Sequence, residues 1–349
     1  MSKHAQFTFH MKAILLTVEL MALVSPAWSA DFNMIDPASH AGAPDGSAGI
    51  AVGKEHFIGV TDENNLLRVY SVADGSKGVP LLDLNPLLGI KAKIKDGKEK
   101  FDECDLEGAA KIGDRIYWIG SHGANKDGKP KKERQVLFAT KAIGSGAETK
   151  LEIVGTVYRT LLDDLQANHD LGSYKLGEAA KKPPKEEGAL NIESLCTAGD
   201  ALYIGFRNPV PEGKALVVPL ANPEAVIAEG KPAMFGKPIS LDLGGLGIRD
   251  MVWWRDSFLI IAGDYRDRFD SDAKPSKLFS WKGGDDQPVD LQVDFGDLNP
   301  EAVIVFPDEK SDRVLILSDD GARKIDGVAI KDMEESKQSF RSVWLQGGL

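Results

Sequence analysis

The sequence predicts an all-β fold, a five-bladed β-propeller, on the basis of three observations. A motif of about sixteen residues occurs five times, each copy contains two short apolar strands joined by a turn, and further strand-like segments follow most copies. A four-stranded unit that repeats along the chain is typical of propeller blades. A β-sandwich does not require such self-similar units and ranks second. Six blades remain an alternative, although the sequence contains no sixth copy of the motif.

Each copy of the motif begins at a polar or charged residue, continues as an apolar strand, turns at a Gly-Asp-type pair and ends in polar residues. The copies are residues 47–62, 107–122, 193–208, 249–264 and 301–319. The first copy is the weakest, and the last has a longer turn. Short β-rich runs bounded by Gly, Asp and Asn indicate strands and hairpins.

Additional strands are expected outside the motif, at residues 66–72, 79–84, 135–142, 151–161, 215–220, 239–243, 278–281 and 289–295. Their apolar runs suit strands covered on both faces, as stacked blades require. Helical periodicity is largely confined to residues 161–166. Two polar inserts, residues 85–104 and 168–189, are interpreted as surface loops, with lids over a site as the alternative.

Residues 1–29 are expected to be a signal peptide. Lys12 leads into an apolar run, and small residues follow at 25, 27, 29 and 30. This order is typical of secretory signals, and the run is too short for stable membrane insertion. Residues 30–349 would then form a single propeller domain, periplasmic or secreted.

The charge of the chain restricts its partners. The 349 residues carry a formal net charge of -11, and removing residues 1–29 leaves the chain near −12. Such acidity argues against nucleic acid and anionic membrane surfaces. We expect a monomer that binds a small molecule, an anionic or ester ligand.

Two cysteines, Cys104 and Cys196, lie beside the motif in neighbouring copies. An oxidising compartment would permit a disulfide between them. Cys104 precedes its motif glutamate by three residues, whereas Cys196 follows its own by three. The two Cα atoms are therefore expected at different positions along their blades, which disfavours a bridge. A disulfide and two buried thiols both remain open.

The predicted fold brings polar residues together at one end of the channel. In a blade the first strand is innermost and the second returns antiparallel to it, so the start of the first meets the end of the second. The strand starts are Ser47, Glu107, Glu193, Arg249 and Glu301. The second tier of polar residues is Asp62, His122, Arg207, Asn208, Asp264, Arg266, Asp319 and Asp320.

Glutamates brought together in this way repel unless a cation compensates them. Arg249 is the built-in countercharge, and Ca²⁺ is the natural bound cation because it takes several carboxylate oxygens. The expected metal ligands are Glu107, Glu193, Glu301 and Asp319. The expected catalytic residues are Glu107, Glu193, His122, Arg249 and Arg207.

These residue types support two hypotheses about function. In the first, the protein is a metal-assisted hydrolase of a phosphoester, ester or lactone, in which Glu107 or Glu193 is the base or metal ligand, Arg249 or Arg207 holds the anion and His122 carries a proton. In the second, it is a non-catalytic propeller that binds a ligand or protein. The glutamates could also lock adjacent blades together by accepting backbone N–H bonds.

Several segments resemble a known family. They are Asp-Leu-Glu-Gly at 105–108 with Ile-Gly-Ser-His at 119–122, Asn-Ile-Glu at 191–193 with Ile-Gly-Phe-Arg at 204–207, Leu-Ser-Asp-Asp-Gly at 317–321, and residues 61–70. In order and composition they are similar to the bacterial domain-of-unknown-function family 3616. The resemblance implies a β-propeller related to phytase-like and esterase-like propellers, whose comparable sites use acidic residues and Ca²⁺. Ser194 and Ala302 stand where that pattern has glycine, which puts the site at those two blades in doubt.

Overall fold

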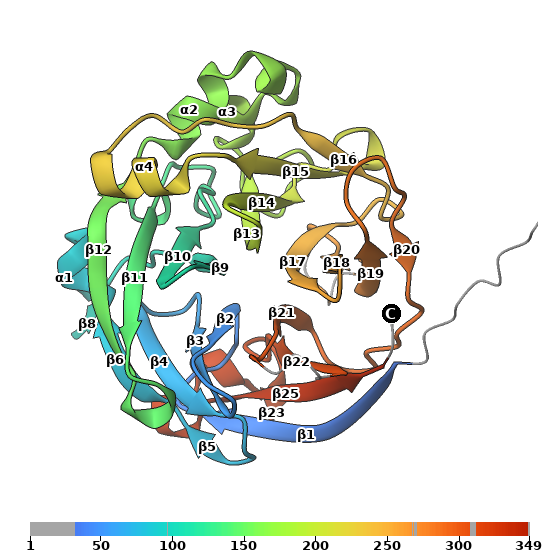
Figure 1. Ribbon diagram of the computed structural model, residues 1–349. Helices are drawn as coiled ribbons and strands as arrows, with labels where there is room; N and C mark the ends of the chain where they lie inside the picture. The colour runs from blue at the N-terminus through green and yellow to red at the C-terminus, as the bar shows by residue number, and fades with distance from the viewer. Residues whose placement is uncertain (1–31, 96, 267, 269–270, 308–311, 348–349) are drawn as a thin grey trace, which may run out of the picture.

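The computed structural model describes residues 32–95, 97–266, 268, 271–307 and 312–347. The predicted signal peptide lies outside these residues. Strands dominate and form five blades around a central channel (Figure 1). The five-bladed propeller predicted from the repeated motif is confirmed.

Four blades are built from consecutive segments of the chain. In each blade the strands are named in order from the channel outward. Blade 1 is β2 (Ala48–Ala51), β3 (His56–Val60), β4 (Leu66–Ser71) and β6 (Val79–Asp83). Blade 2 is β9 (Leu106–Ile112), β10 (Arg115–Gly120), β11 (Leu137–Ile143) and β12 (Lys150–Tyr158). Blade 3 is β13 (Asn191–Ala198), β14 (Ala201–Asn208), β15 (Ala215–Leu220) and β16 (Ile239–Leu241). Blade 4 is β17 (Gly247–Trp254), β18 (Ser257–Gly263), β19 (Lys277–Trp281) and β20 (Val289–Asp290).

Blade 5 joins the two ends of the described chain. Its strands, again from the channel outward, are β21 (Pro300–Ile304), β22 (Arg313–Ser318), β25 (Ser339–Gln346) and β1 (Asn33–Ala41). The N-terminal β1 pairs antiparallel with the C-terminal β25, and β5 (Ser76–Lys77) adds two residues parallel to β1. Closing the ring with strands from both ends leaves no open gap between the first and last blades.

The remaining elements are short and lie in the connections. The hairpins are β7 (Lys93–Lys95) with β8 (Lys98–Lys100) and β23 (Lys324–Ile325) with β24 (Val328–Ala329). The helices are α1 (Leu84–Leu88), α2 (Leu161–Ala167), α3 (Leu176–Ala179) and α4 (Pro223–Glu229), and 3-10 turns cover Lys132–Arg134, Gly146–Glu148, His169–Tyr174, Pro211–Gly213, Ile330–Asp332 and Glu335–Lys337. Within the described ranges, no helix has both the length and the apolar character needed to cross a membrane.

The core is divided among the interfaces between neighbouring blades. Five apolar clusters fill the five interfaces, including the one between blades 5 and 1. In β18, Ile260 packs toward blade 3 and Ile261 toward blade 5. Every residue of β18 is buried because both faces of the strand are covered, which explains its uninterrupted apolar sequence.

The two cysteines do not form a disulfide. Both Cys104 and Cys196 are free and buried. Cys104 packs between blades 1 and 2, whereas Cys196 packs between blades 3 and 4. Burial raises the pKa of both thiols, to about 12 for Cys104, so neither is a reactive thiolate near neutral pH.

Candidate functional site

Four of the five innermost strands begin with a β-bulge. In β9, β13, β17 and β21 the pairing with the second strand of the blade skips one residue, which is Glu107, Glu193, Arg249 and Glu301, respectively. A bulge breaks the two-residue alternation of side chains and re-aims the extra residue. All four of these side chains line one cavity of about 620 Å³ at the end of the channel where the innermost strands begin.

The fifth innermost strand differs from the other four. β2 pairs with β3 without a register shift, and the Ser47 amide donates to the Val60 carbonyl at 3.1 Å. The Ser47 hydroxyl donates to Asp45 Oδ1 at 2.9 Å instead of lining the cavity. The expected ring of five strand-start residues therefore has four members.

Carboxylates crowd one side of the cavity. Asp62, Asp105 and Glu107 each offer an oxygen, and these oxygens lie within 4.8 Å of one another. Burial raises the pKa of Asp62 and Glu107 well above the usual range, and neighbouring carboxylates raise it further. Three such groups cannot all be charged at this distance unless protons or a cation compensate them.

Hydrogen bonds fix the loops that carry this acidic group. Asp45 Oδ1 accepts the amide of Asp62 at 3.2 Å, and Asp45 Oδ2 accepts the Thr61 hydroxyl at 2.6 Å. Asp105 accepts the Ser121 hydroxyl and forms an ion pair with Arg134 at 2.9 Å. The protein therefore fixes the backbone at Asp62 and the carboxylate of Asp105.

Ion pairs occupy the opposite side of the cavity. Arg207 Nη1 donates to Glu193 Oε1 at 2.7 Å, while its other nitrogens donate to the carbonyls of Asp264 and Arg266 at 2.7 and 2.8 Å. Arg207 is thus committed to the fold rather than available for an anion. Arg249 forms an ion pair with Glu301 through Nη2.

Two buried atoms at this side have no hydrogen-bond partner among the described residues. They are Arg249 Nε and Glu193 Oε2, which lie 3.8 Å apart. Both residues are nearly inaccessible, with 4% of Arg249 and 2% of Glu193 exposed. A buried polar atom without a partner is rare and marks a place where a ligand or water can bind.

Glu301 and Asp319 also line the cavity but are not part of the acidic group. Burial raises the pKa of Glu301 even though Arg249 opposes that shift. Asp319 accepts hydrogen bonds from Asn299 Nδ2 at 3.0 Å and from the Gly321 amide at 2.8 Å. Of the four metal ligands expected from the sequence, only Glu107 belongs to the close group of three carboxylates.

His122 does not reach the cavity. Its φ of 56° turns the chain after β10, and its Nδ1 lies 2.8 Å from the Gly120 carbonyl. The side chain is fully buried, and burial lowers its pKa to about 4. The lowered pKa disfavours the charged imidazolium, and His122 is not among the residues that line the cavity, so the structure gives no support to the proton-carrying role expected from the sequence.

Sequence reasoning overlooked Asp45, Asp105 and Arg134. A signal for the first two was present, because a residue that can accept hydrogen bonds stands two positions before four of the five strand-start residues. These residues are Asp45, Asp105, Asn191 and Asn299. Arg134 belongs to the connection between β10 and β11. The motif does not cover this connection and therefore could not predict the position of Arg134.

The two departures from the Glu-Gly pattern leave the site intact. Ser194 Oγ donates to Asp250 Oδ1 of the next blade at 3.2 Å. Ala302 is buried between blades 1 and 5. The bulges at Glu193 and Glu301 form as the one at Glu107 does. The missing glycines therefore do not change the backbone at these two strand starts.

Both inserts reach the site, the insert at residues 85–104 through Glu103. Pro183, Pro184 and Lys185, from the insert at residues 168–189, line the cavity. Asn208 Nδ2 anchors this stretch by donating to the carbonyls of Pro184 and Glu186 at 3.0 and 2.7 Å. The insert at residues 168–189 therefore forms part of the cavity wall, whereas its composition favoured a surface loop.

Comparison with known proteins identifies a family match and a set of distant structures. The family model described as "Protein of unknown function (DUF3616)" matches residues 141–326, more than half of the chain. None of the curated proteins matches the sequence.

Among solved structures, the chain is similar to the WD40 β-propeller domain of Doa1, with 12% identity, a TM-score of 0.28 and coverage of 83% of this chain and 67% of that one. Virginiamycin B lyase from Staphylococcus aureus is 8% identical, with a TM-score of 0.37 and coverage of 90% and 99%. Trypanosoma rangeli sialidase is 9% identical, with a TM-score of 0.38 and coverage of 90% and 51%. With TM-scores below 0.5, these structures carry no information about the function of this chain.

Proposed function

The chain belongs to the DUF3616 family of proteins of unknown function, and on that premise we propose that its acidic cavity binds Ca²⁺ and hydrolyses a phosphoester, ester or lactone. The observation that carries the proposal is the group formed by Asp62, Asp105 and Glu107, whose oxygens lie within 4.8 Å of one another. Among the described residues, this is the one group of three such ligands that lies so close together.

The donor set fits calcium better than a transition metal. Its three side chains offer only carboxylate oxygens, the ligands that Ca²⁺ prefers, whereas zinc favours histidine and cysteine. Hydrogen bonds with Ser121 and Arg134 use one oxygen of Asp105, which leaves its second oxygen for the ion. A divalent cation would also relieve the repulsion that raises the pKa of Asp62 and Glu107.

The cavity also provides groups for the reaction itself. A bound calcium ion would polarise the phosphoryl or carbonyl oxygen of the substrate. Glu193 Oε2, which has no hydrogen-bond partner among the described residues, can accept a proton from an attacking water. Arg249 Nε can donate to an anionic oxygen of the substrate. In this scheme Glu107 is a metal ligand and Glu193 is the base.

The test begins with calcium binding. The protein is stripped with EDTA and its thermal unfolding is followed as Ca²⁺ is added. A hundredfold excess over Kd stabilises the folded state by about 2.7 kcal/mol. We expect Glu107→Gln and Asp62→Asn to lose this shift and Glu63→Gln to keep it, since Glu63 lines the cavity outside the close group.

Turnover is then measured on a panel of phosphoesters, esters and lactones. Glu193→Gln is expected to bind Ca²⁺ normally and to lose activity at least a hundredfold, as removal of a general base does. If the wild type shows no calcium-dependent shift, or if Glu107→Gln retains it in full, the acidic group is not a calcium site.

A second candidate function is a non-catalytic propeller that binds a ligand or a protein. Its support is that Arg207 and the Thr61 and Ser121 hydroxyls are engaged in hydrogen bonds within the fold. Saturable ligand binding without turnover on any substrate of the panel would favour this function.

The remaining proposals concern the cellular setting. The predicted signal peptide supports export to the periplasm or the medium, and the acidic charge supports a small-molecule ligand rather than nucleic acid. We propose a monomer. N-terminal sequencing of the secreted protein tests export, because the mature chain should begin near residue 30. The mass of the protein in solution tests whether it is a monomer.

A further inference from the structure

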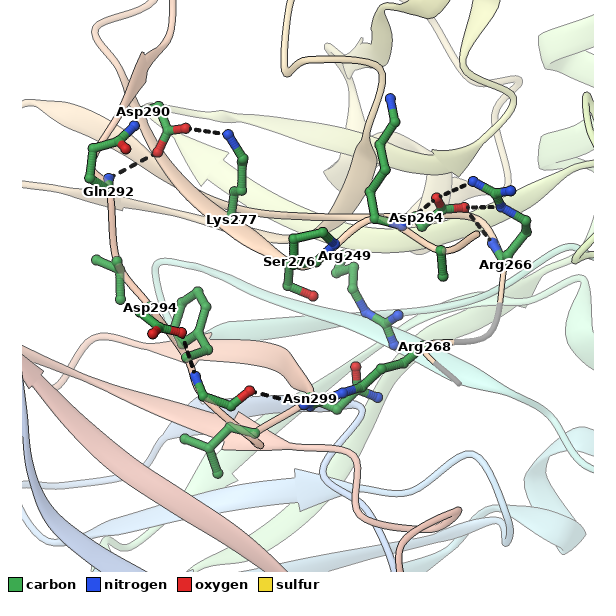
Figure 2. A pocket seen from close by; sticks show the side chains of 17 residues that line it. Arg249, Asp264, Arg266, Arg268, Ser276, Lys277, Asp290, Gln292, Asp294 and Asn299 are labelled. Carbon is green, nitrogen blue, oxygen red and sulfur yellow. Dashed lines mark hydrogen bonds and ion pairs between the residues drawn. The ribbon is translucent and has the colours of Figure 1, made fainter. Parts of the chain in front are cut away.

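A second cavity adjoins the acidic one. It measures about 460 Å³ and is lined by described residues on either side of β19 and by residues 292–299, which connect β20 to β21 (Figure 2). Arg249, Arg268 and Asn299 line both cavities. We infer that this second cavity, here called the basic cleft, binds the negatively charged group of an organic anion. The identity of that anion as the substrate rests on the proposed function, but its binding does not.

Positive charge exceeds negative charge in the basic cleft. Its lining includes five cationic side chains, Arg249, Arg266, Arg268, Lys274 and Lys277, and three carboxylates, Asp264, Asp290 and Asp294. When Glu301, the partner of Arg249, is counted with them, the excess is one positive charge in a chain whose formal net charge is -11. A local field of this sign attracts anions into a protein that otherwise repels them.

Three of these cations are already paired with carboxylates, and Arg249 is one of them, through its ion pair with Glu301. Arg266 forms two hydrogen bonds with the Asp264 carboxylate, at 3.0 and 2.8 Å. Lys277 pairs with Asp290 at 2.7 Å. In Figure 2 these two ion pairs lie at opposite sides of the cleft, with Arg249 between them.

Arg268 and Lys274 are held differently. Arg268 Nη2 donates to the Gly296 carbonyl at 3.0 Å, and Lys274 Nζ donates to the Gly244 carbonyl at 2.8 Å. A carbonyl oxygen fixes the direction of a cation without cancelling its charge. Both cations therefore keep the charge and the remaining donors that a phosphate or carboxylate requires.

Arg249 provides an independent indication of a ligand. Only 4% of Arg249 is exposed, the residue lines both cavities, and its Nε lies 3.8 Å from Glu193 Oε2, too far for a hydrogen bond, so it has no hydrogen-bond partner among the described residues. An oxyanion at the junction of the cavities would supply that partner. A solely structural arginine in this position would be expected to use Nε as Arg207 does, in a bond to a carbonyl.

The basic cleft also has an apolar wall. Val293, Phe295 and Leu298 line it beside the charged groups. An inorganic ion would leave this wall in contact with water, whereas the carbon skeleton of an organic anion would cover it. The favoured ligands are therefore organic phosphates or carboxylates with a hydrocarbon or ring portion next to the charge.

The two cavities together define the substrate class. Because the close group of Asp62, Asp105 and Glu107 repels anions until a cation is bound, the charged end of the substrate enters the basic cleft. The group to be cleaved then lies past Arg249, at the carboxylates. The substrate class that fits is an organic anion whose phosphoester, ester or lactone bond is separate from the charged group in the cleft.

Binding is tested by calorimetry in EDTA, which removes any contribution from calcium. The probes are inorganic phosphate and phenylphosphonate, whose carbon–phosphorus bond resists hydrolysis. We expect phenylphosphonate to bind at least threefold more tightly than phosphate, because only phenylphosphonate covers the apolar wall. Arg268→Ala and Lys274→Ala should each weaken its binding about tenfold, whereas Lys282→Ala, an exposed lysine of blade 4 outside the cleft, should not.

Three results would overturn the inference: no saturable binding of phenylphosphonate to the wild type, unchanged affinity in both cleft variants, or equal loss in the control Lys282→Ala. Circular dichroism spectra and melting temperatures confirm that each variant is folded. The outcome is independent of the proposed function, because a protein that binds no Ca²⁺ and hydrolyses nothing can still bind phenylphosphonate in the cleft.

Discussion

Arg207 and Glu193 face each other on β14 and β13 with 2.7 Å between Nη1 and Oε1, and each is the extra residue of a bulge on its own strand. The two bulges turn both side chains in the same direction, so a pair separated by fourteen residues in sequence meets at the channel. Both side chains are buried, and their bond therefore forms away from water.

Arg207→Met is expected to destabilise the protein by about 3–5 kcal/mol, because it removes the countercharge that is hydrogen-bonded to the buried Glu193 carboxylate. Urea unfolding measures the change. Glu193→Gln in the same chain should recover part of the loss, and the exposed Lys214→Met should have almost no effect. Equal stability of Arg207→Met and the wild type would mean that the pair does not hold the blade together.

Gly108→Ala tests the close approach of blades 2 and 3. A Cβ at this position would lie 2.6 Å from the Leu195 backbone nitrogen, which cannot move without displacing β13. We expect a loss of about 1–3 kcal/mol of stability in urea unfolding. Gly172→Ala is the matched control, since a Cβ there meets nothing within 4 Å. A similar effect of both changes would show that packing between blades is not the cause.

His40 makes the closure of the ring sensitive to acid. It lies on β1, and its ring nitrogens contact the hydroxyls of Ser76 and Ser342 at 2.6 and 2.8 Å. Burial lowers its pKa from 6.5 to about 4. Between these values the unfolded chain binds the proton and the folded protein does not, so the stabilisation is complete above pH 6.5 and declines as the pH falls to 4.

At pH 4.5 this linkage costs about 2.5 kcal/mol relative to pH 7. His40→Gln should therefore lose less stability than the wild type between these two pH values, by about that amount, in urea unfolding. The exposed His169→Gln is the control and should behave as the wild type does. An acid response of His40→Gln equal to that of the wild type would contradict the assignment.

Asp250 connects three blades, and its removal should weaken the ring. Its carboxylate accepts the Val303 amide at 2.8 Å from blade 5 and the Ser194 hydroxyl at 3.2 Å from blade 3. Asp250→Ala leaves the Val303 amide buried without a partner, which costs about 1–3 kcal/mol. Thermal and urea unfolding check this, with the exposed Asp200→Ala as control. An unchanged midpoint in Asp250→Ala would mean that water replaces the carboxylate.

The repeated part of the fold and part of the site could be predicted from the sequence. The motif predicted the two inner strands of every blade because its apolar runs are covered on both sides. It also placed Glu107, Glu193, Arg249 and Glu301 at one cavity, because their positions follow from the register of the repeat.

Other features could not be predicted, because they depend on contacts with residues distant in sequence or on single backbone angles. β1 contains an Asp-Pro pair and charged neighbours, and its strand conformation depends on a partner about 300 residues away. His122 follows its strand as a site residue would, but one left-handed backbone angle turns it into the core. Whether an arginine is free or bound to carbonyls, as Arg207 is, depends on loops of the next blade.

The pairing of β1 with β25 also sets an order of events during synthesis. The first described strand leaves the ribosome long before the strand it pairs with, and it cannot take its place until residue 346 has emerged. Until then blades 1 and 5 have no closed interface, and the aromatic surface formed by Phe57 and Tyr70 has no cover from Phe340 and Trp344. A chain that stops within the last blade would therefore form an open ring, with the aromatic surface of blade 1 exposed to water.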